Sequence, residues 1–484
     1  MSEMMTDDIM LLMPQIVLVI GGMILMLLEP FTSPERKGQL GRIAVLTCVV
    51  AAFSLMPQWN VTPRKILQGM FLVDNFSVFF QWLFLIIGGV CAFVSMKFNE
   101  RESINRGEYY ALLLFACSGM SLMAASGDLI LTFLGLEILS IATYILAGFK
   151  RNDGRSSESS LKYFLLGSFA SAILLYGIAL IYGGTGSTDY HSIRQLAELQ
   201  SSIQTTTMIG MVLLLVGFGF KVALVPFHSW VPDVYEGAPT PVTAFMTVGP
   251  KAAGFAALLR VLLQAFPFLV QDWSSILWLI AILTMTVGNV VAVLQTNVKR
   301  MLAYSAIAHA GYILIGIVAS TEDGISAVLF YLVAYTVMNL LAFSIVLSFS
   351  RSGDMRVNLD DYAGLARRAP MAAAALALAL ISLAGIPLTG GFMGKFYLFS
   401  AAIQEKLIGL AVIGVLNSVV SVFYYFRLLV YMYMKEPADD APQPDSISWP
   451  VKAIIVLGTI GIFLLGVYPA PILALAARSA FALK

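Results

Sequence analysis

MVLLLVGFGFKVALVPFHSWVP, residues 211–232, is the stretch that decides the fold. It opens as an apolar run of the kind that crosses a membrane, but it carries Lys221 and is interrupted by Pro226. Proline has no amide hydrogen, so the carbonyl of residue 222 loses its helical partner and the helix should break there. Irregular backbone at membrane depth is tolerated only inside a protein or beside a wet cavity. The stretch therefore predicts an interrupted membrane helix with a lysine at the break.

A second stretch, ALISLAGIPLTGGFMGKFYLF at residues 379–399, has the same features. Pro387, Gly390 and Gly391 lie in the middle of an apolar run, and Lys395 follows directly. Paired interrupted helices are the best sequence indication of the ion site of a transporter. Two interrupted spans, each with one lysine, therefore predict an ion pathway.

The composition places the whole chain in lipid. Of its 484 residues 59% are hydrophobic and 12% charged, whereas soluble domains have about 25% charged residues. A formal net charge of +1 gives no reason to expect a nucleic acid partner. Because a membrane helix needs about 20 mostly apolar residues, we predict an all-α integral membrane protein with about fourteen spans and no soluble domain. The predicted spans are 10–29, 41–56, 76–96, 109–125, 128–149, 159–182, 206–227, 242–263, 275–294, 299–318, 325–349, 370–401, 408–434 and 453–470.

The orientation follows from the basic residues. More than half of the 29 Lys and Arg residues fall in the loops on one side of these spans, and cytoplasmic loops carry such an excess. Both termini should then face outward, into the periplasm if the chain lies in a bacterial inner membrane. The N-terminus, MSEMMTDDIM, lacks the basic region of a signal peptide, so the first span should be retained.

Seven basic residues fall within or at the ends of the spans instead of in loops. A charge near a span end can reach the interface through its long side chain, and we interpret three of the seven as such anchors. Lys162, one turn into the sixth span, could do the same or pair with an interior acid. The others lie deeper, where a charge usually has a partner or a task. The seven are Lys162, Lys221, Lys251, Arg260, Lys395, Arg427 and Lys452, of which Arg260, Arg427 and Lys452 are the three near span ends.

Glu137 and Lys251 should lie near mid-membrane. Glu137 is nine residues past Asp128, which is about 14 Å along a helix, and Lys251 is equally far into its span. Burial favours the neutral form of a carboxyl, and a nearby ammonium restores the charged form. Buried lysine can likewise lose its proton, whereas arginine stays charged. These residues are candidates for proton transfer; the alternative for Glu137 is a statically paired structural glutamate.

Two histidines in apolar surroundings, His228 and His309, could join such a relay, because an unperturbed imidazole titrates near neutral pH. A satisfied structural role is the alternative for each. The cysteines, Cys48, Cys91 and Cys117, have no metal-ligand spacing and cannot hold an iron–sulfur cluster alone. No G-x-G-x-x-G follows a strand. We therefore expect no metal, nucleotide or other cofactor in this chain.

The spacing of the two breaks suggests an internal repeat. They fall in the seventh and twelfth spans, so a five-helix unit at 109–265 would recur at 273–434. Because five is odd, the copies must enter the membrane from opposite sides and be inverted. Three helices, 1–108, precede the units, and an acidic proline-rich loop with the last helix, 435–484, follows them.

Four stretches carry a resemblance to a known family: LTFLGLEILSIATYIL, GFGFKVALVPFHSWVPDVYEGAPTPVTAF, NVVAVLQTNVKRMLAYSAIAHAGY and LAGIPLTGGFMGKFYLF. The chain resembles the antiporter-like subunits of complex I, the proton-pumping NADH:quinone oxidoreductase, and of Mrp-type antiporters. The resemblance implies that Glu137 and Lys221 form an ion pair, that Lys251 is a central relay and that Lys395 serves the second half-channel. Glu108 matches a further family acid, although an interfacial glutamate is the alternative at that position.

The resemblance also implies the partners. NADH oxidation and quinone reduction, with FMN and iron–sulfur clusters, would belong to other subunits, and neighbouring membrane subunits would contact this chain. A subunit of an Mrp-type Na⁺/H⁺ antiporter or of a related hydrogenase membrane arm is the first alternative. A stand-alone transporter of an organic solute would need polar groups at the breaks, where GFGF and GIPLTGG offer mainly backbone. A structural scaffold would leave the deep lysines unexplained.

Overall fold

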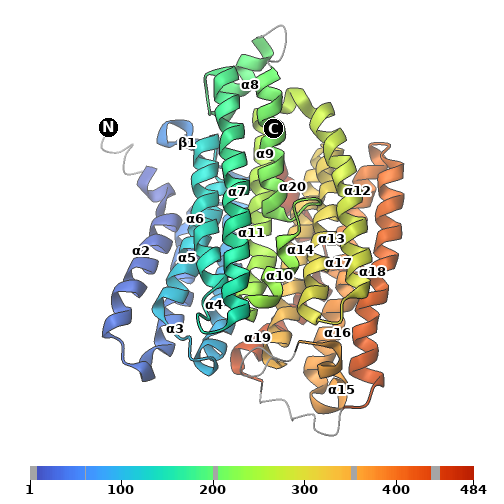
Figure 1. The fold of residues 1–484 in the computed structure, drawn as a ribbon. Coiled ribbons are helices and arrows are strands. Elements are labelled where there is room, and N and C mark those ends of the chain that lie inside the picture. Colours follow the sequence, from blue (N-terminus) through green and yellow to red (C-terminus); the bar gives the residue numbers. More distant parts are fainter. Residues whose placement is uncertain (1–7, 60–61, 200–204, 350–356, 438–446, 484) are drawn as a thin grey trace.

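The computed structural model describes residues 8–59, 62–199, 205–349, 357–437 and 447–483. Helices standing side by side form one bundle (Figure 1). Twelve helices of the described residues are long and apolar enough to cross a membrane, so the prediction of a multi-pass helical membrane protein is confirmed. They are α2 (Met13–Leu28), α3 (Gly38–Leu55), α4 (Asn75–Arg101), α6 (Leu129–Ala147), α7 (Gly154–Thr185), α9 (Thr205–Val222), α11 (Thr240–Arg260), α12 (Val270–Leu294), α13 (Val298–Ala319), α14 (Glu322–Phe349), α18 (Ile408–Met434) and α19 (Trp449–Val467).

Other elements complete the bundle. The fourth predicted span corresponds to α5 (Gly107–Ala124), and the twelfth to two helices, α16 (Pro370–Ala384) and α17 (Gly390–Gln404). The total of fourteen spans stays a prediction, and most of the acidic loop, residues 438–446, lies outside the described residues. The sequence did not predict α8 (Tyr190–Leu199), the short α10 (Trp230–Gly237) and α15 (Leu365–Arg368), α20 (Ala470–Phe481), or the antiparallel hairpin β1 (Arg64–Ile66) and β2 (Phe71–Val73).

Short polar side chains fix where several of the helices begin. Asp74 accepts a hydrogen bond from the amide of Ser77 at 2.7 Å, while the Ser77 hydroxyl accepts one from the amide of Asp74 at 3.0 Å, which starts α4. Asp128 starts α6 by accepting from the amide of residue 130, and Asn297 starts α13 by accepting from the amide of residue 300. Each satisfies an amide that the first turn of a helix leaves free.

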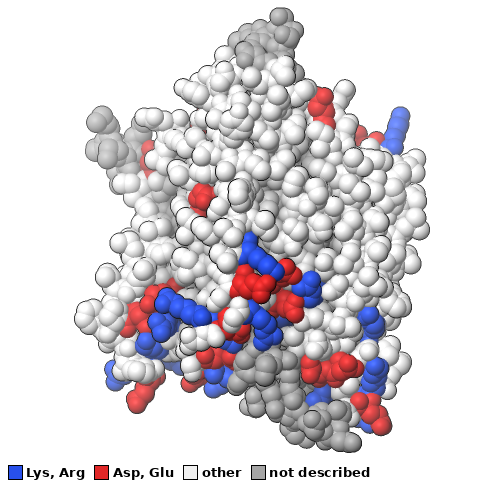
Figure 2. Space-filling model, in the orientation of Figure 1, with Lys and Arg blue, Asp and Glu red and all other residues white. Residues whose placement is uncertain are grey.

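The interior of the bundle is centred on α11, in which every residue is buried. It packs against α4, α5, α9 and α14. Helices at the periphery, such as α7 and α18, expose large apolar side chains including Phe169 and Val419. On the face drawn in Figure 2 a broad upper region is mostly free of charge, and most charged residues gather from the centre toward the lower end. The bundle therefore has the apolar belt that a bilayer requires.

Both predicted interruptions lie where the prolines put them. The helix α9 ends at Val222 and α10 begins at Trp230, while α16 ends at Ala384 and α17 begins at Gly390. From α9 to α10 the chain runs downward in Figure 1, and from α16 to α17 it runs upward. The two interrupted helices thus run in opposite directions.

Candidate functional site

The first break is stabilised by hydrogen bonds in place of the lost helical ones. After Val222 the backbone turns through Ala223, which has a φ of 67°. The amide of Leu224 donates to the carbonyl of Gly219 at 2.7 Å, and the amide of Val225 donates to the Thr284 hydroxyl at 3.1 Å. The backbone amides of the break are thus hydrogen-bonded inside the protein, which is necessary because the membrane interior offers no water to bond them.

Lys221 occupies the last turn of α9, directly before this break, and only 5% of it is exposed. Its ammonium donates to the Ser140 hydroxyl of α6 at 2.9 Å. The position is favourable because the C-terminal end of a helix carries partial negative charge. A buried ammonium is therefore held here by a neutral hydroxyl and a helix end.

Glu137 lies on the same helix as Ser140 but is only half-buried. Its carboxylate accepts a hydrogen bond from the Ser171 hydroxyl of α7 at 2.5 Å. The ion pair with Lys221 that the family resemblance implied is not closed, although both residues belong to the described part of the chain. The physical reason is that two serines provide nearer partners, one for each charge.

Lys251 lies on α11 at the centre of the bundle and is 2% exposed. Its ammonium donates to the backbone carbonyl of Ala306 on α13 and lies 5.3 Å from the centre of the Tyr335 ring on α14. A carbonyl oxygen and the face of an aromatic ring both attract a cation without carrying a full charge. The second deep lysine is again held by neutral groups.

Lys395 uses the second break in a way that the sequence did not predict. Its ammonium donates to the carbonyls of Leu383 at 3.1 Å and Ala384 at 3.0 Å, the C-terminal end of α16. It also donates to the Ser418 hydroxyl at 2.8 Å and lies 4.7 Å from the Tyr312 ring centre. The lysine therefore caps the carbonyls that the broken helix leaves unpaired.

Two glycines make this arrangement possible. Gly385 ends α16 with a φ of +87°, and a Cβ there would lie 3.0 Å from the side chain of Lys395. A Cβ on Gly391 would lie 1.8 Å from the carbonyl oxygen of Ser382. Gly390, which begins α17, is buried against α19. Side chains at Gly385 and Gly391 would push the two half-helices apart, so glycine is required at both positions.

His309 lies between the last two lysines. Its ring centre is 5.2 Å from that of Tyr335, the ring next to Lys251, and 5.7 Å from that of Tyr312, the ring next to Lys395. It is 1% exposed. The structure therefore brings Lys251, His309 and Lys395 into one buried aromatic cluster on α11, α13, α14 and α17.

Lys162 does not reach this interior. It pairs with Glu158 at 2.7 Å and with Asp233 of α10 at 3.0 Å, and Arg300 pairs with Asp233 and with Glu236, each at 2.8 Å. The sequence left open whether Lys162 would find an acid, and the acid is Asp233. These side chains line an open cavity of about 280 Å³. Asp233 and Glu236 were missed, although their two charges in the WVPDVYEG segment were a usable signal.

The remaining candidates lie apart from the lysine cluster. His228 is half-buried within the first break, and its Nδ1 has no hydrogen-bond partner among the described residues. Glu108 is half-buried at the start of α5, where one carboxylate oxygen likewise lacks a partner within the described ranges. Neither residue contacts Lys221, Lys251 or Lys395 in any hydrogen bond or ion pair formed by the described residues.

The prediction that Arg260 is an interfacial anchor is wrong. The side chain is fully buried, and its guanidinium binds both carboxylate oxygens of Asp74 at 2.8 Å. It also donates to the carbonyl of Ala124 at 2.8 Å. Arg427 lies near a span end as expected, but it donates to the carbonyls of Val293 and Gln295 at the end of α12. Both arginines found partners that are distant in the sequence.

Lys299, at the start of a predicted span, was not among the buried charges singled out in the sequence. It lies in the first turn of α13, is fully buried, and donates to the carbonyl of Ala238 at 2.8 Å. The sequence around Lys299 did not indicate that a distant backbone carbonyl would accept its hydrogen bond. A contact between α10 and α13 is what buries it.

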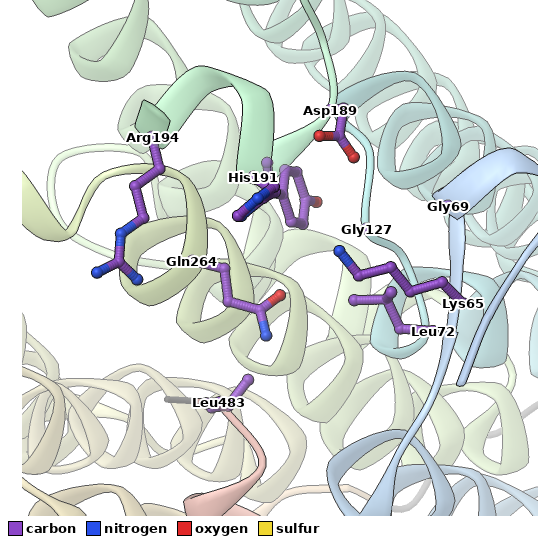
Figure 3. Close-up of a pocket in the computed structure, with 10 residues that line it drawn as sticks. Lys65, Gly69, Leu72, Gly127, Asp189, His191, Arg194, Gln264 and Leu483 are labelled. Atoms are coloured by element: carbon purple, nitrogen blue, oxygen red, sulfur yellow. The ribbon is translucent and has the colours of Figure 1, made fainter. Parts of the chain in front are cut away.

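A separate cavity of about 200 Å³ lies at the end of the molecule that carries α8. In Figure 3 Lys65 from β1 points into it, and His191 from α8 and Gln264 lie across from it. At its rim, the carboxylate of Asp189 accepts hydrogen bonds from the amide and the hydroxyl of Ser192. None of the residues proposed for proton transfer lines this cavity.

Residues 126–421 match the family model described as "NADH:quinone oxidoreductase/Mrp antiporter, TM". The chain therefore belongs to this family of antiporter-like membrane subunits. Within the family it groups with subunit N of NADH-quinone oxidoreductase. A subunit N of Trichlorobacter lovleyi is 47% identical over 98% of this chain and 97% of its own length, and one of Solibacter usitatus is 44% identical over 99% and 98%.

Solved structures show the same fold. A chain of respiratory complex I from Thermus thermophilus is 35% identical and covers 96% of this chain and 100% of its own, with a TM-score of 0.81. A chain of the Mrp complex from Dietzia is 22% identical, covering 98% and 97%, with a TM-score of 0.85. The first match favours complex I over the Mrp alternative, since the second shows the fold alone.

Proposed function

We propose that this subunit of NADH-quinone oxidoreductase conducts protons through Lys221, Lys251 and Lys395, with His309 between the last two. The observation that carries the proposal is that each ammonium is buried, yet hydroxyls, backbone carbonyls and ring faces hold it, not carboxylates. Burial disfavours a charged lysine, and a nearby carboxylate would compensate. No carboxylate forms an ion pair with these lysines in the described part of the chain, so each can give up its proton as well as accept one.

Glu137 acts as the switch in this proposal. When its carboxylate meets Lys221, the lysine keeps its proton; when they separate, the lysine passes the proton toward Lys251. The hydrogen bonds of Glu137 to Ser171 and of Lys221 to Ser140 support the separated arrangement as one of the two states. The signal that changes the state comes from a neighbouring subunit, because redox chemistry with FMN, iron–sulfur clusters and quinone belongs to the partners.

An inverted repeat, as predicted from the sequence, would place the pathway near the middle of the membrane. The helix pair α5 and α6 packs closely, as do α12 and α13, and α9 packs on α7 as α16 packs on α14. These pairings follow the order expected of units at 109–265 and 273–434. Charged residues gather at the lower end of Figure 2, which supports a cytoplasmic lower end with periplasmic termini in a bacterial inner membrane.

Assembly distinguishes this proposal from the Mrp alternative. The chain, expressed with its native partners and tagged, should co-migrate in blue-native gels with NADH dehydrogenase activity. Co-migration with an assembly that lacks flavin and iron–sulfur proteins would favour the Mrp alternative instead.

The role of Lys221 is tested by proton pumping. In vesicles containing the assembled complex, Lys221→Ala should lower the number of protons moved per electron, because the alanine cannot carry one. Lys452→Ala is the matched control, since Lys452 is exposed at the start of α19. Normal pumping by an assembled Lys221→Ala complex would refute the proposal.

A further inference from the structure

His309 has a hydrogen-bond partner at both ring nitrogens. Its Nδ1 lies 2.5 Å from the Tyr331 hydroxyl of α14, and its Nε2 lies 3.1 Å from the Tyr425 hydroxyl of α18. Both tyrosines are fully buried. Three helices therefore supply one continuous row of polar groups inside the buried core.

The row extends one residue further on the Tyr425 side. The Tyr425 hydroxyl also forms a hydrogen bond with the Ser305 hydroxyl of α13. Ser305 precedes Ala306, whose carbonyl accepts a hydrogen bond from the ammonium of Lys251. One end of the row is therefore next to the lysine at the centre of the bundle.

The other end lies beside the second break. The Tyr331 ring packs so closely on Gly394 that a Cβ there would lie 2.4 Å from a ring carbon. Gly394 directly precedes Lys395. The row Ser305, Tyr425, His309 and Tyr331 thus leads from the backbone next to Lys251 to the backbone next to Lys395.

The chemistry of these groups permits transfer along the row. A neutral imidazole has one N–H donor and one acceptor nitrogen, and a tyrosine hydroxyl both donates and accepts. One tyrosine must therefore donate to the ring while the other accepts from it. A proton that enters at one ring nitrogen can displace the proton on the other.

We propose that Tyr425 and Tyr331 are proton-relay residues on either side of His309. Ser305 takes the proton that Lys251 releases as it gives its own to the Tyr425 oxygen. The Tyr425 hydroxyl then gives its original proton to Nε2, and Nδ1 gives its proton to the Tyr331 oxygen. The original proton of the Tyr331 hydroxyl then passes to the neutral amine of Lys395. One proton enters the row, one leaves it, and no electron moves. This inference rests on the proton-conducting role proposed above.

The chain provides a matched control for the test. Tyr163 on α7 is also buried, and its ring stacks on that of Trp230. Its hydroxyl has no hydrogen-bond partner among the residues that the structure describes. Tyr163→Phe therefore removes a buried tyrosine hydroxyl that does not belong to the row.

The experiment measures protons moved per electron in vesicles with the assembled complex, for Tyr331→Phe, Tyr425→Phe, Tyr163→Phe and Lys395→Ala. Phenylalanine keeps the ring packing, and blue-native gels check assembly. We expect Tyr331→Phe and Tyr425→Phe each to lose as much pumping as Lys395→Ala, while Tyr163→Phe pumps like the wild type.

Two outcomes would overturn the inference. Normal pumping by Tyr331→Phe or Tyr425→Phe, with pumping lost in Lys395→Ala, would refute the tyrosine relay and leave the lysine pathway standing. An equal loss in Tyr163→Phe would show that removing any buried tyrosine hydroxyl lowers pumping, and would refute the relay. Normal pumping by Lys395→Ala would instead refute the function proposed for the chain.

Discussion

Replacing Asp74 by asparagine should destabilise the protein far more than removal of a surface charge. Arg260 is fully buried, and two hydrogen bonds of 2.8 Å join its guanidinium to the Asp74 carboxylate. Asparagine keeps an oxygen that can accept from the Ser77 amide and start α4, so the substitution isolates the loss of charge. It leaves a buried arginine without its counter-ion, which costs about 3–5 kcal/mol.

The free energy of unfolding can be measured by titrating SDS into mixed micelles that contain the purified protein. Asp74→Asn should lose about 3–5 kcal/mol, and the double variant Asp74→Asn with Arg260→Met should regain most of it. The double variant should remain about 1 kcal/mol less stable than the wild type, because it also lacks the hydrogen bond from Arg260 to the Ala124 carbonyl. Glu100→Gln, at an exposed pair with Lys97, is the control and should leave the midpoint unchanged. A loss below about 1 kcal/mol for Asp74→Asn, the range of surface pairs, would refute this reasoning.

Two further predictions concern the second break and the charged network. Gly385→Ala should cost about 1 kcal/mol or more, since φ is +87° and the new Cβ would press on Lys395; unchanged SDS unfolding would contradict the proposed need for glycine. Burial raises the pKa of Asp233, but hydrogen bonds from Arg300 and Lys162 outweigh it and hold the pKa below its usual value. A lowered pKa gives stability that is present above the unfolded-state pKa and is lost as pH falls through the folded-state pKa. The stability difference between wild type and Asp233→Asn should therefore be constant from about pH 5 to 8 and shrink below about pH 4; a difference that already changes near pH 7 would contradict it.

Features set by neighbours in the sequence could be predicted from it. Pro226 and Pro387 remove particular helical hydrogen bonds, and both interruptions lie at those prolines. Long apolar runs likewise predicted the membrane helices, and the depth of Lys251 followed from its place in a run. In each case the physical cause acts within about one helical span.

Features set by distant partners could not be predicted. Arg260 looked like an interfacial anchor because its counter-ion, Asp74, is 186 residues away. The carbonyls that hold Lys395 are nearby in sequence, but only the turn at Gly385 aims them at the ammonium. Nothing in the sequence pairs Tyr331 or Tyr425 with His309, because three helices must first pack together.

Lys251→Arg tests the central claim most directly, because arginine keeps the positive charge at the centre of the bundle but cannot release a proton. The measurement is the number of protons moved per electron during NADH oxidation in vesicles that contain the assembled complex. We predict normal assembly and a lowered proton count. A Lys251→Arg complex that assembles and pumps like the wild type would contradict proton transfer through this lysine.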